Sequence, residues 1–337
     1  MVLSVKKYNS FTSTNEALYE NLYENALNLS STCSYTFIKC LNKDYLWRFL
    51  NRYDPEILIV SDETNKPVMI APFAYDRRAK KHRFIYAVNG AEYCDFIYSD
   101  KTDDSVIKNA LGMVFSELEG ELELNWIPEG KTKRLLEGMG YLPSHTYENT
   151  IIDLTPFENH NVYISSLSKN ARQNLRTSYN RLEKDNKSIK LILEKKVSNK
   201  IFSQIIDLYQ QRHNIAYGIK TGWFKGFYLK HFNYSSRCLK TSAESLHAIL
   251  YIDGKMASFC SGYLREGRYI IPRLSMNTNY KFYSPGILLI NELAKHAFAD
   301  ICISKIDLAL GNEKYKLQMG GKVIYSYKFA INCYNYK

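Results

Sequence analysis

The 337-residue sequence has few residues that cross-link or interrupt a chain: seven cysteines, eight prolines and 16 glycines. The cysteines are odd in number and scattered, and no C-x-x-C pair occurs, which argues against a disulfide framework and a zinc site. No apolar run reaches the ~18 residues that span a bilayer, and the N-terminus lacks the apolar core of a signal peptide. We therefore expect a cytoplasmic protein that holds no metal.

Several catalytic motifs are also missing. The sequence contains no H-E-x-x-H, no G-x-S-x-G and no G-x-x-x-x-G-K-[ST], which argues against zinc peptidases, α/β-hydrolases and P-loop proteins. Its 45% hydrophobic and 23% charged residues are typical of a folded protein, and its length favours two domains.

The net charge of +11 is unevenly divided. Residues 1–155 hold 17 lysines and arginines against 22 acidic residues, whereas residues 156–337 hold 28 against 12, a net charge of +16. The second half therefore suits an anionic ligand: a phosphate-bearing cofactor, a nucleotide sugar, an RNA or an anionic membrane surface. A solvated basic surface is the plain alternative.

The pattern of the first half predicts alternating strands and helices. Strands are expected over residues 56–61, 67–75, 82–88, 93–98, 121–127 and 150–154, the first two as a hairpin. Helices are expected after Asp103 and over residues 131–138. Thr155 and the proline after it mark the boundary between domains of residues 1–155 and 156–337.

The second half opens on a basic helix. Ser168 is a suitable N-cap, and the residues up to Lys184 place a largely apolar stripe along one side. The stripe consists of Ala171, Leu175, Ser178 and Leu182. Lys169, Arg172 and Arg176 form an adjacent stripe, and two arginines one turn apart can hold phosphate or carboxylate with paired planar guanidinium groups. We interpret these three residues as the binding site of an anionic acceptor substrate, with a solvated amphipathic helix as the alternative.

A meander follows. Strands are expected over residues 246–252, 255–264 and 268–276, with tight turns at Asp253–Gly254 and Glu266–Gly267. Pro272 cannot donate a ladder hydrogen bond, so the third strand should carry a bulge or an edge there, and a bulge can re-aim groups toward a ligand. Before the meander, a further helix is expected over residues 223–232.

The segment after the meander predicts a loop that leads into a helix. Ser284 suits the N-cap, Pro285 suits the first helical position, and Gly286 allows a ligand close to the backbone. Free N–H groups at a helix start, together with the helix dipole, attract phosphate. Because Ser-Pro-Gly is also an ordinary helix start, the neighbouring motifs decide the interpretation.

These neighbouring motifs occur together in a known family. Tyr283-Ser284-Pro285-Gly286 precedes a leucine-rich helix, an Ile306-Asp307 strand follows, and Gly311-Asn312-Glu313 and Tyr315-Lys316 come last. With the basic helix, this order resembles the CelD-like acetyltransferases, a branch of the GNAT superfamily related to the FemABX transferases. The resemblance covers residues 166–321.

The resemblance implies two tandem GNAT-like (acyl-CoA N-acyltransferase) α/β domains with mixed, largely antiparallel sheets, the second of them active. It implies transfer of an acyl group, with acetyl the expected one, from acyl-CoA to an amine or hydroxyl of a sugar, nucleotide sugar or lipid-linked sugar in surface polysaccharide biosynthesis. The donor pyrophosphate would lie on Ser284, Pro285 and Gly286. Lys281 opens this loop, where the superfamily has Q/R-x-x-G-x-G/A, and it is expected to bind the donor with them.

No cysteine has a recognisable activating partner, which favours direct transfer in a ternary complex. The attacking amine must lose a proton while charge builds on the thioester oxygen. Asp307 or Glu313 is expected to accept the proton, and Lys316 to stabilise the oxyanion or bind an acceptor phosphate. Tyr315 and Lys316 match the F/Y-K motif of FemABX active sites. A turn cap at Asp307, a solvated Glu313 and a local ion pair at Lys316 are the structural alternatives.

Two other functions stay open. A Fem-like transferase that uses aminoacyl-tRNA would suit the basic half, although no long heptad-rich arm is visible. A non-catalytic glycan- or RNA-binding module is compatible with the 28 tyrosines.

Overall fold

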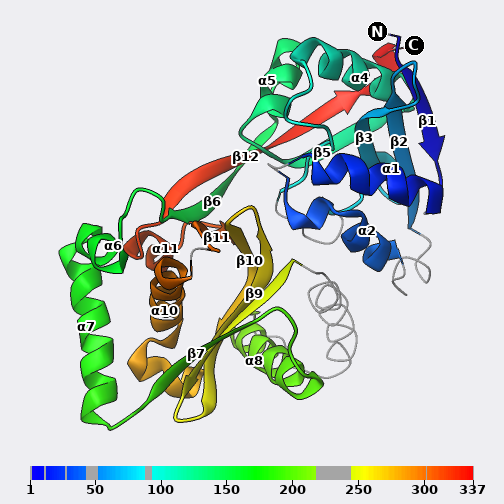
Figure 1. Cartoon of the computed structure of the whole chain (residues 1–337). Helices are drawn as coiled ribbons and strands as arrows, with labels where there is room; N and C mark the ends of the chain where they lie inside the picture. Colours follow the sequence, from blue (N-terminus) through cyan, green and yellow to red (C-terminus); the bar gives the residue numbers. More distant parts are fainter. Residues whose placement is uncertain are drawn as a thin grey trace. The chain divides into compact units, whose positions relative to one another are not determined.

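The computed structural model describes residues 2–10, 13–26, 29–42, 52–87, 93–217, 244–300 and 302–336. The chain divides into two compact units, which we call unit 1 (Met1–Glu148 with Tyr325–Lys337) and unit 2 (Asn149–Ile324) (Figure 1). The expected boundary after Thr155 leaves the C-terminal strand in the second domain. In the structure this strand, β12 (Lys322–Asn332), pairs antiparallel with β5 (Glu121–Pro128) over residues 326–332 and thereby completes the sheet of unit 1.

Unit 1 is a mixed sheet with helices on both faces. Its strands follow the order β1-β2-β3-β4-β5-β12. The remaining bounds are β1 Ser4–Tyr8, β2 Tyr53–Ser61, β3 Pro67–Asp76, β4 Lys81–Phe84, α1 Ser13–Glu24, α2 Tyr35–Asn42, α4 Asp104–Ser116 and α5 Lys131–Gly138. The predicted first hairpin is confirmed as β2 and β3. The strand expected over residues 93–98 is wrong, because this segment forms only an isolated bridge between Ile97 and Ile70.

The strands of unit 2 follow the order β6-β11-β10-β9-β8-β7 and include both parallel and antiparallel pairs. Its elements are β6 His145–Asp153, which enters from unit 1, α6 His160–Ser166, α7 Lys169–Lys184, β7 Ile189–Glu194, α8 Asn199–Tyr217, β8 Ser245–Ile252, β9 Lys255–Arg265, β10 Arg268–Met276, α10 Pro285–Ala299, β11 Lys305–Leu310 and α11 Lys314–Gln318. The basic helix and the meander are confirmed. The helix expected over residues 223–232 lies outside the described residues.

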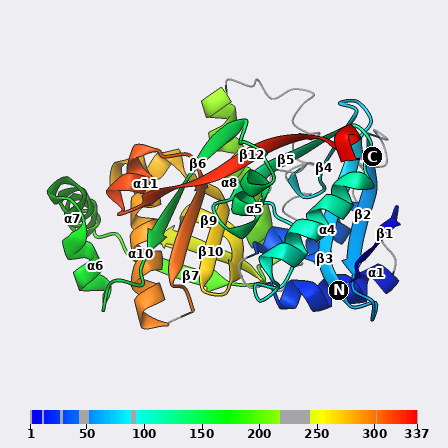
Figure 2. The same ribbon diagram turned by 90° about the horizontal axis from the view of Figure 1, so that it is seen from above.

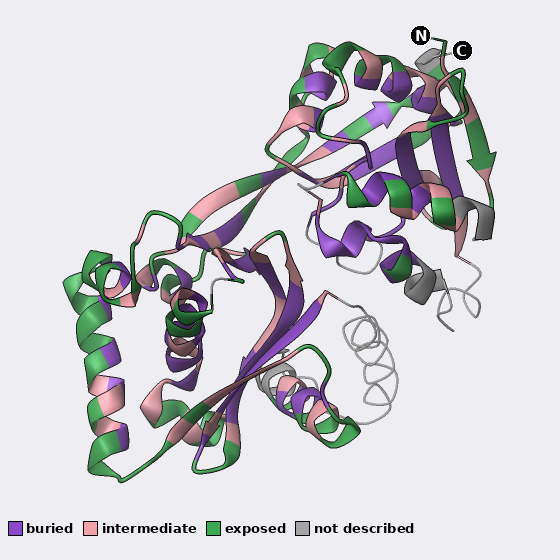
Figure 3. Ribbon diagram, viewed as in Figure 1, coloured by how far each residue is buried: buried purple, intermediate pink, exposed green. Residues whose placement is uncertain are grey.

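Apolar side chains cover both faces of the unit 2 sheet. One face packs against α7 and α10 through Leu175, Leu182, Leu289 and Leu293, which are all buried. The other face packs against α8 through Ile205 and Leu208. Figure 3 shows the resulting purple sheet between helices that are green on their outer sides. Within the described residues, no helix is both long and apolar enough to cross a membrane.

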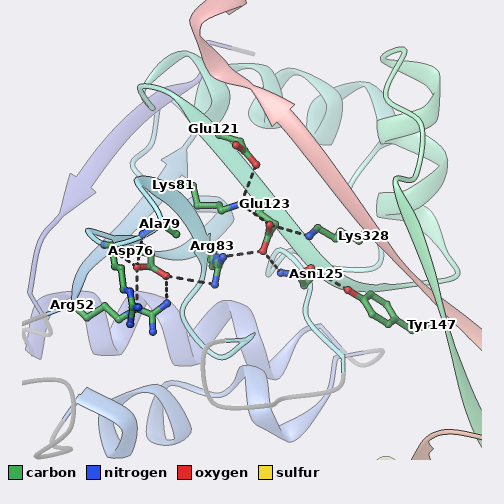
Figure 4. A network of polar contacts seen from close by, with 11 residues as sticks. Arg52, Asp76, Ala79, Lys81, Arg83, Glu121, Glu123, Asn125, Tyr147 and Lys328 are labelled. Atoms are coloured by element: carbon green, nitrogen blue, oxygen red, sulfur yellow. Dashed lines mark hydrogen bonds and ion pairs between the residues drawn. The ribbon is translucent and has the colours of Figure 1, made fainter. Parts of the chain in front are cut away.

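A charged network crosses β3, β4, β5 and β12 in unit 1 (Figure 4). The Glu123 carboxylate of β5 lies 2.9 Å from the Nζ atoms of both Lys81 and Lys328, and Asn125 donates to it at 2.8 Å. Although burial raises the pKa of Glu123, these hydrogen bonds lower it to about 2. Because Lys328 belongs to β12, the network helps to hold the C-terminal strand in unit 1.

We expect Glu123→Gln to lower the free energy of unfolding by about 2 kcal/mol at neutral pH. A depressed carboxyl pKa stabilises the fold above the ordinary pKa of 4.5, and this contribution is lost as the pH falls toward 2. Urea unfolding at pH 7, 5 and 3 measures this contribution. The difference in the free energy of unfolding between the variant and the unmodified protein should shrink as the pH falls. Glu121→Gln is the control, because its exposed pair with Lys81 is worth little. Equal losses in the two variants would contradict the prediction.

Candidate functional site

Strands β10 and β11 separate partway along their length. They pair in parallel only from Arg268 opposite Lys305 to Ile270 opposite Asp307. Beyond Ile270, no strand among the described residues pairs with this side of β10, although β10 continues to Met276. The expected irregularity at Pro272 is confirmed by a register shift against β9 between Ile270 and Arg273. The far half of β10 thus presents an open edge to a ligand.

A pocket of about 300 Å³ lies beside the end of β10. Its walls come from β10, from the start of α10 with the loop before it, and from α11. The lining residues are Leu274, Met276, Lys281, Ser284, Gly286, Ile287 and Tyr315. Three of the four residues predicted to bind the donor therefore line one cavity, together with the predicted catalytic residue Tyr315.

The start of α10 has an unusual backbone. Ser284 adopts the left-handed conformation with φ 54° and ψ 53°, which costs a non-glycine residue about 1 to 2 kcal/mol. Ser284 occupies the predicted N-cap position, but its hydroxyl makes no capping hydrogen bond within the described segment 278–299. Pro285 has no N–H, so Gly286 carries the first N–H of the helix, and a Cβ added there would meet nothing within 4 Å.

Lys316 does not point into this pocket. Its side chain is 3% exposed, and its Nζ lies 2.6 Å from the Leu310 carbonyl oxygen, 3.3 and 3.4 Å from those of Gly311 and Ala309, and 2.9 Å from the Glu313 carboxylate. An ammonium group has three N–H donors, and these four oxygens engage all of them. Lys316 therefore fixes the turn between β11 and α11, with the exposed Glu313 carboxylate as its partner, and its expected oxyanion role stays a prediction.

Replacing Lys316 should therefore act on stability. We expect Lys316→Met to lower the free energy of unfolding by about 2 kcal/mol, because buried carbonyl oxygens lose a charged donor. Chemical denaturation of the full chain measures this change. Lys314→Met is the control, since Lys314 lies exposed in the same short helix and should change stability by less than about 0.5 kcal/mol. A Lys316→Met protein as stable as the control would restore a purely functional role for Lys316.

Asp307 is likewise engaged. It is fully buried, its Oδ2 accepts from the Arg268 Nε at 2.9 Å, and its Oδ1 accepts from the Ala309 N–H at 2.8 Å. Ala309 has φ 58°, so this carboxylate holds a bend at the end of β11. The alternative of a structural carboxylate at Asp307 therefore fits the structure better than a proton acceptor.

The three cations predicted to bind the acceptor lie away from the pocket. Arg181, in the last turn of α7, donates to the Phe282 carbonyl oxygen at 2.7 Å, so this end of the helix meets the pocket loop. Lys169 lies about 18 Å away along the helix axis. Arg172 donates to the Ser165 and Leu167 carbonyl oxygens and thereby fixes the junction of α6 and α7. The structure does not gather Lys169, Arg172 and Arg176 with the donor residues.

Sequence reasoning missed the apolar wall of the pocket and the partner of Asp307. Leu274 and Met276 alternate along β10 and so share one face, a signal that was present in the sequence. Ile287 follows directly after Gly286. Arg268 gave no signal, because its pairing with Asp307 joins residues 39 positions apart.

Helix α4 of unit 1 begins differently from α10. Asp103 caps it and Asp104 lies in its first turn. Two carboxylates at that position repel phosphate, whereas the first turn of α10 holds no acid.

Residues 169–317 match the acetyltransferase (GNAT) domain family. The matched segment contains the open edge of β10, the start of α10 and Tyr315, and it lies wholly within unit 2. The narrower assignment to the CelD-like branch stays a prediction. Among curated protein sequences, none matches the chain.

Solved structures resemble the chain over nearly its whole length. FemX has a TM-score of 0.61 at 8% identity and covers 98% of each chain. A tandem GNAT protein from the clavulanic acid biosynthesis pathway has a TM-score of 0.56 at 8% identity, covering 98% of this chain and 99% of that one. The C-terminal domain of a putative lysylphosphatidylglycerol synthetase from Agrobacterium fabrum has a TM-score of 0.57 at 12% identity, covering 95% and 94%. Such likeness concerns the fold alone, and it confirms the predicted tandem GNAT-type α/β fold.

Proposed function

We propose that the chain is an acyl-CoA-dependent acyltransferase that moves an acetyl group directly to an amine or hydroxyl of a sugar or nucleotide sugar in surface polysaccharide biosynthesis. The GNAT domain supports the transferase class. The observation that carries the donor assignment is the pocket in which the strained, acid-free start of α10 adjoins the open edge of β10.

The pocket residues fit such a donor. The Gly286 N–H and the helix dipole would hold the pyrophosphate, with the Lys281 ammonium group as a nearby cation. The open edge of β10 would pair with the amides of the pantetheine arm, as an added strand does. Leu274, Met276 and Ile287 would exclude water from the thioester. Bound acyl-CoA would supply the activated acyl group.

Tyr315 is the phenol that lines this pocket. In the reaction, the acceptor nitrogen or oxygen bonds to the acyl carbon and the bond from that carbon to sulfur breaks. We assign Tyr315 the role of giving its phenolic proton to the leaving sulfur. The proton lost by the acceptor then returns to Tyr315 through water, so that the side chain is restored. This role replaces those expected for Asp307 and Lys316.

A thermal shift experiment tests the donor class. The full chain is heated alone and with acetyl-CoA, UDP-N-acetylglucosamine or bulk tRNA in turn. A ligand at 100 times its Kd should add about 2.7 kcal/mol of stability. We expect stabilisation by acetyl-CoA, and mass spectrometry of an acceptor mixture should then show the added acetyl group. Stabilisation by tRNA alone would overturn the proposal in favour of an aminoacyl-tRNA-dependent transferase.

A further inference from the structure

The outer face of α7 is a basic surface that the pocket does not use. The helix carries five lysines and arginines and one acid, Glu183, within 16 residues. Its buried side, which includes Ala171 and Leu175, packs on the core of unit 2. The opposite side therefore faces solvent, and Figure 2 shows α7 at the outer edge of unit 2.

Three cations lie in line along this outer face. Lys169, Arg176 and Lys184 occupy positions about two helical turns apart, which places them on one side of the helix over roughly 22 Å. All three are exposed, and no ion pair formed between described residues includes them. By contrast, Arg172 and Arg181 are held by backbone carbonyl oxygens. The three in-line cations are thus available to an external anion.

Two exposed apolar side chains lie in the segments that adjoin the two ends of α7. Phe282 is 57% exposed, and the Arg181 guanidinium lies 4.3 Å from the centroid of its ring. Val162, in the helix that leads into α7, is 43% exposed. A nucleic acid backbone would contact the cations and gain nothing from Val162. A bilayer interface accepts both, because cations meet the headgroup phosphates while apolar side chains enter the acyl boundary.

We propose that α7 docks this protein onto an anionic phospholipid surface through Lys169, Arg176 and Lys184, with Phe282 and Val162 as shallow apolar contacts. This attachment goes beyond the proposed acyl transfer and does not depend on it. Each cation near an anionic surface contributes about 1 kcal/mol at physiological salt, so three of them give a reversible, salt-sensitive association.

Vesicle co-sedimentation of the full chain tests the proposal. The vesicles are pure phosphatidylcholine, or phosphatidylcholine with one third phosphatidylglycerol. We expect binding to the anionic vesicles that falls with added salt. The variant K169Q/R176Q/K184Q should bind about 150-fold more weakly. The control K66Q/K80Q/K101Q removes the same charge from exposed lysines of unit 1 and should bind as the unmodified protein does. Melting temperatures establish that both variants fold.

Three results would overturn this assignment. The first is absence of binding to anionic vesicles at low salt. The second is an equal loss of binding in the two triple variants, which would indicate a dependence on net charge alone. The third is binding of bulk tRNA, lost only in the α7 variant, by a protein that ignores vesicles, which would make the surface a nucleic-acid site. The thermal shift with acetyl-CoA measures donor binding separately. None of these three results therefore contradicts the acyltransferase proposal.

Discussion

Gly286→Asp should weaken acetyl-CoA binding by about 1,000-fold, because a like charge set against a phosphate costs several kcal/mol. Gly286 carries the first N–H of α10 and lines the pocket. A Cβ added there meets nothing within 4 Å, so the backbone has room for a side chain. A carboxylate in the first turn of a helix also interacts favourably with the helix dipole. The melting temperature of the variant should therefore be no lower than that of the unmodified protein. Isothermal titration with acetyl-CoA measures the loss.

Gly286→Ala is the matched control for this prediction. It adds one methyl group in the same open space, and it should raise stability by up to about 1 kcal/mol through helix propensity. Its affinity for acetyl-CoA should stay within tenfold of the original. If Gly286→Asp binds acetyl-CoA as Gly286→Ala does, the phosphates do not lie at the start of α10, and the donor assignment fails.

Tyr315→Phe should lower turnover by about 100-fold or more, because the leaving sulfur loses its proton donor. The substitution removes one oxygen and keeps the ring that lines the pocket. Donor affinity should therefore change little, so the loss should appear in kcat. Steady-state kinetics with acetyl-CoA and the acceptor found by mass spectrometry measure the two constants.

Tyr283→Phe provides the comparison. Tyr283 is close to the pocket in sequence but donates its hydrogen bond to Asp185 and does not line the cavity. It should keep nearly full turnover. A Tyr315→Phe enzyme with unchanged kcat would remove the proton-donor role. A rise in KM alone would indicate that the hydroxyl binds substrate without taking part in the proton transfer.

Features that depend on neighbouring residues could be predicted well from the sequence. The apolar stripe and Ser168 cap indicated α7, which begins and ends where expected. The Asp253–Gly254 turn indicated the hairpin of β8 and β9, and Pro272 indicated the irregularity in β10. The start of α10 was equally local, since proline at the first position and glycine after it have strong conformational preferences.

Features that depend on distant residues could not be predicted in this way. The sequence indicated Asp307 as a carboxylate at the end of a strand, but its Oδ2 accepts from Arg268, 39 positions earlier, which the parallel pairing of β10 and β11 brings there. The C-terminal strand shows the same limit, because its place in unit 1 depends on pairing with β5, about 200 residues earlier. Such pairings are chosen by the packing of the whole sheet.

By itself, the sequence determined a two-unit α/β protein with an acid-free helix start suited to phosphate, since caps, turns and helical stripes are set by short-range sterics and hydrogen bonds. Only the tertiary structure decided which side chains share the pocket. It placed Tyr315 against the start of α10, paired Asp307 with Arg268, held Lys316 against backbone carbonyl oxygens, and left the cations of α7 facing outward. The physical reason is that burial and ion pairing determine which charged residues remain available to a ligand. Both arise only when distant strands and helices pack together.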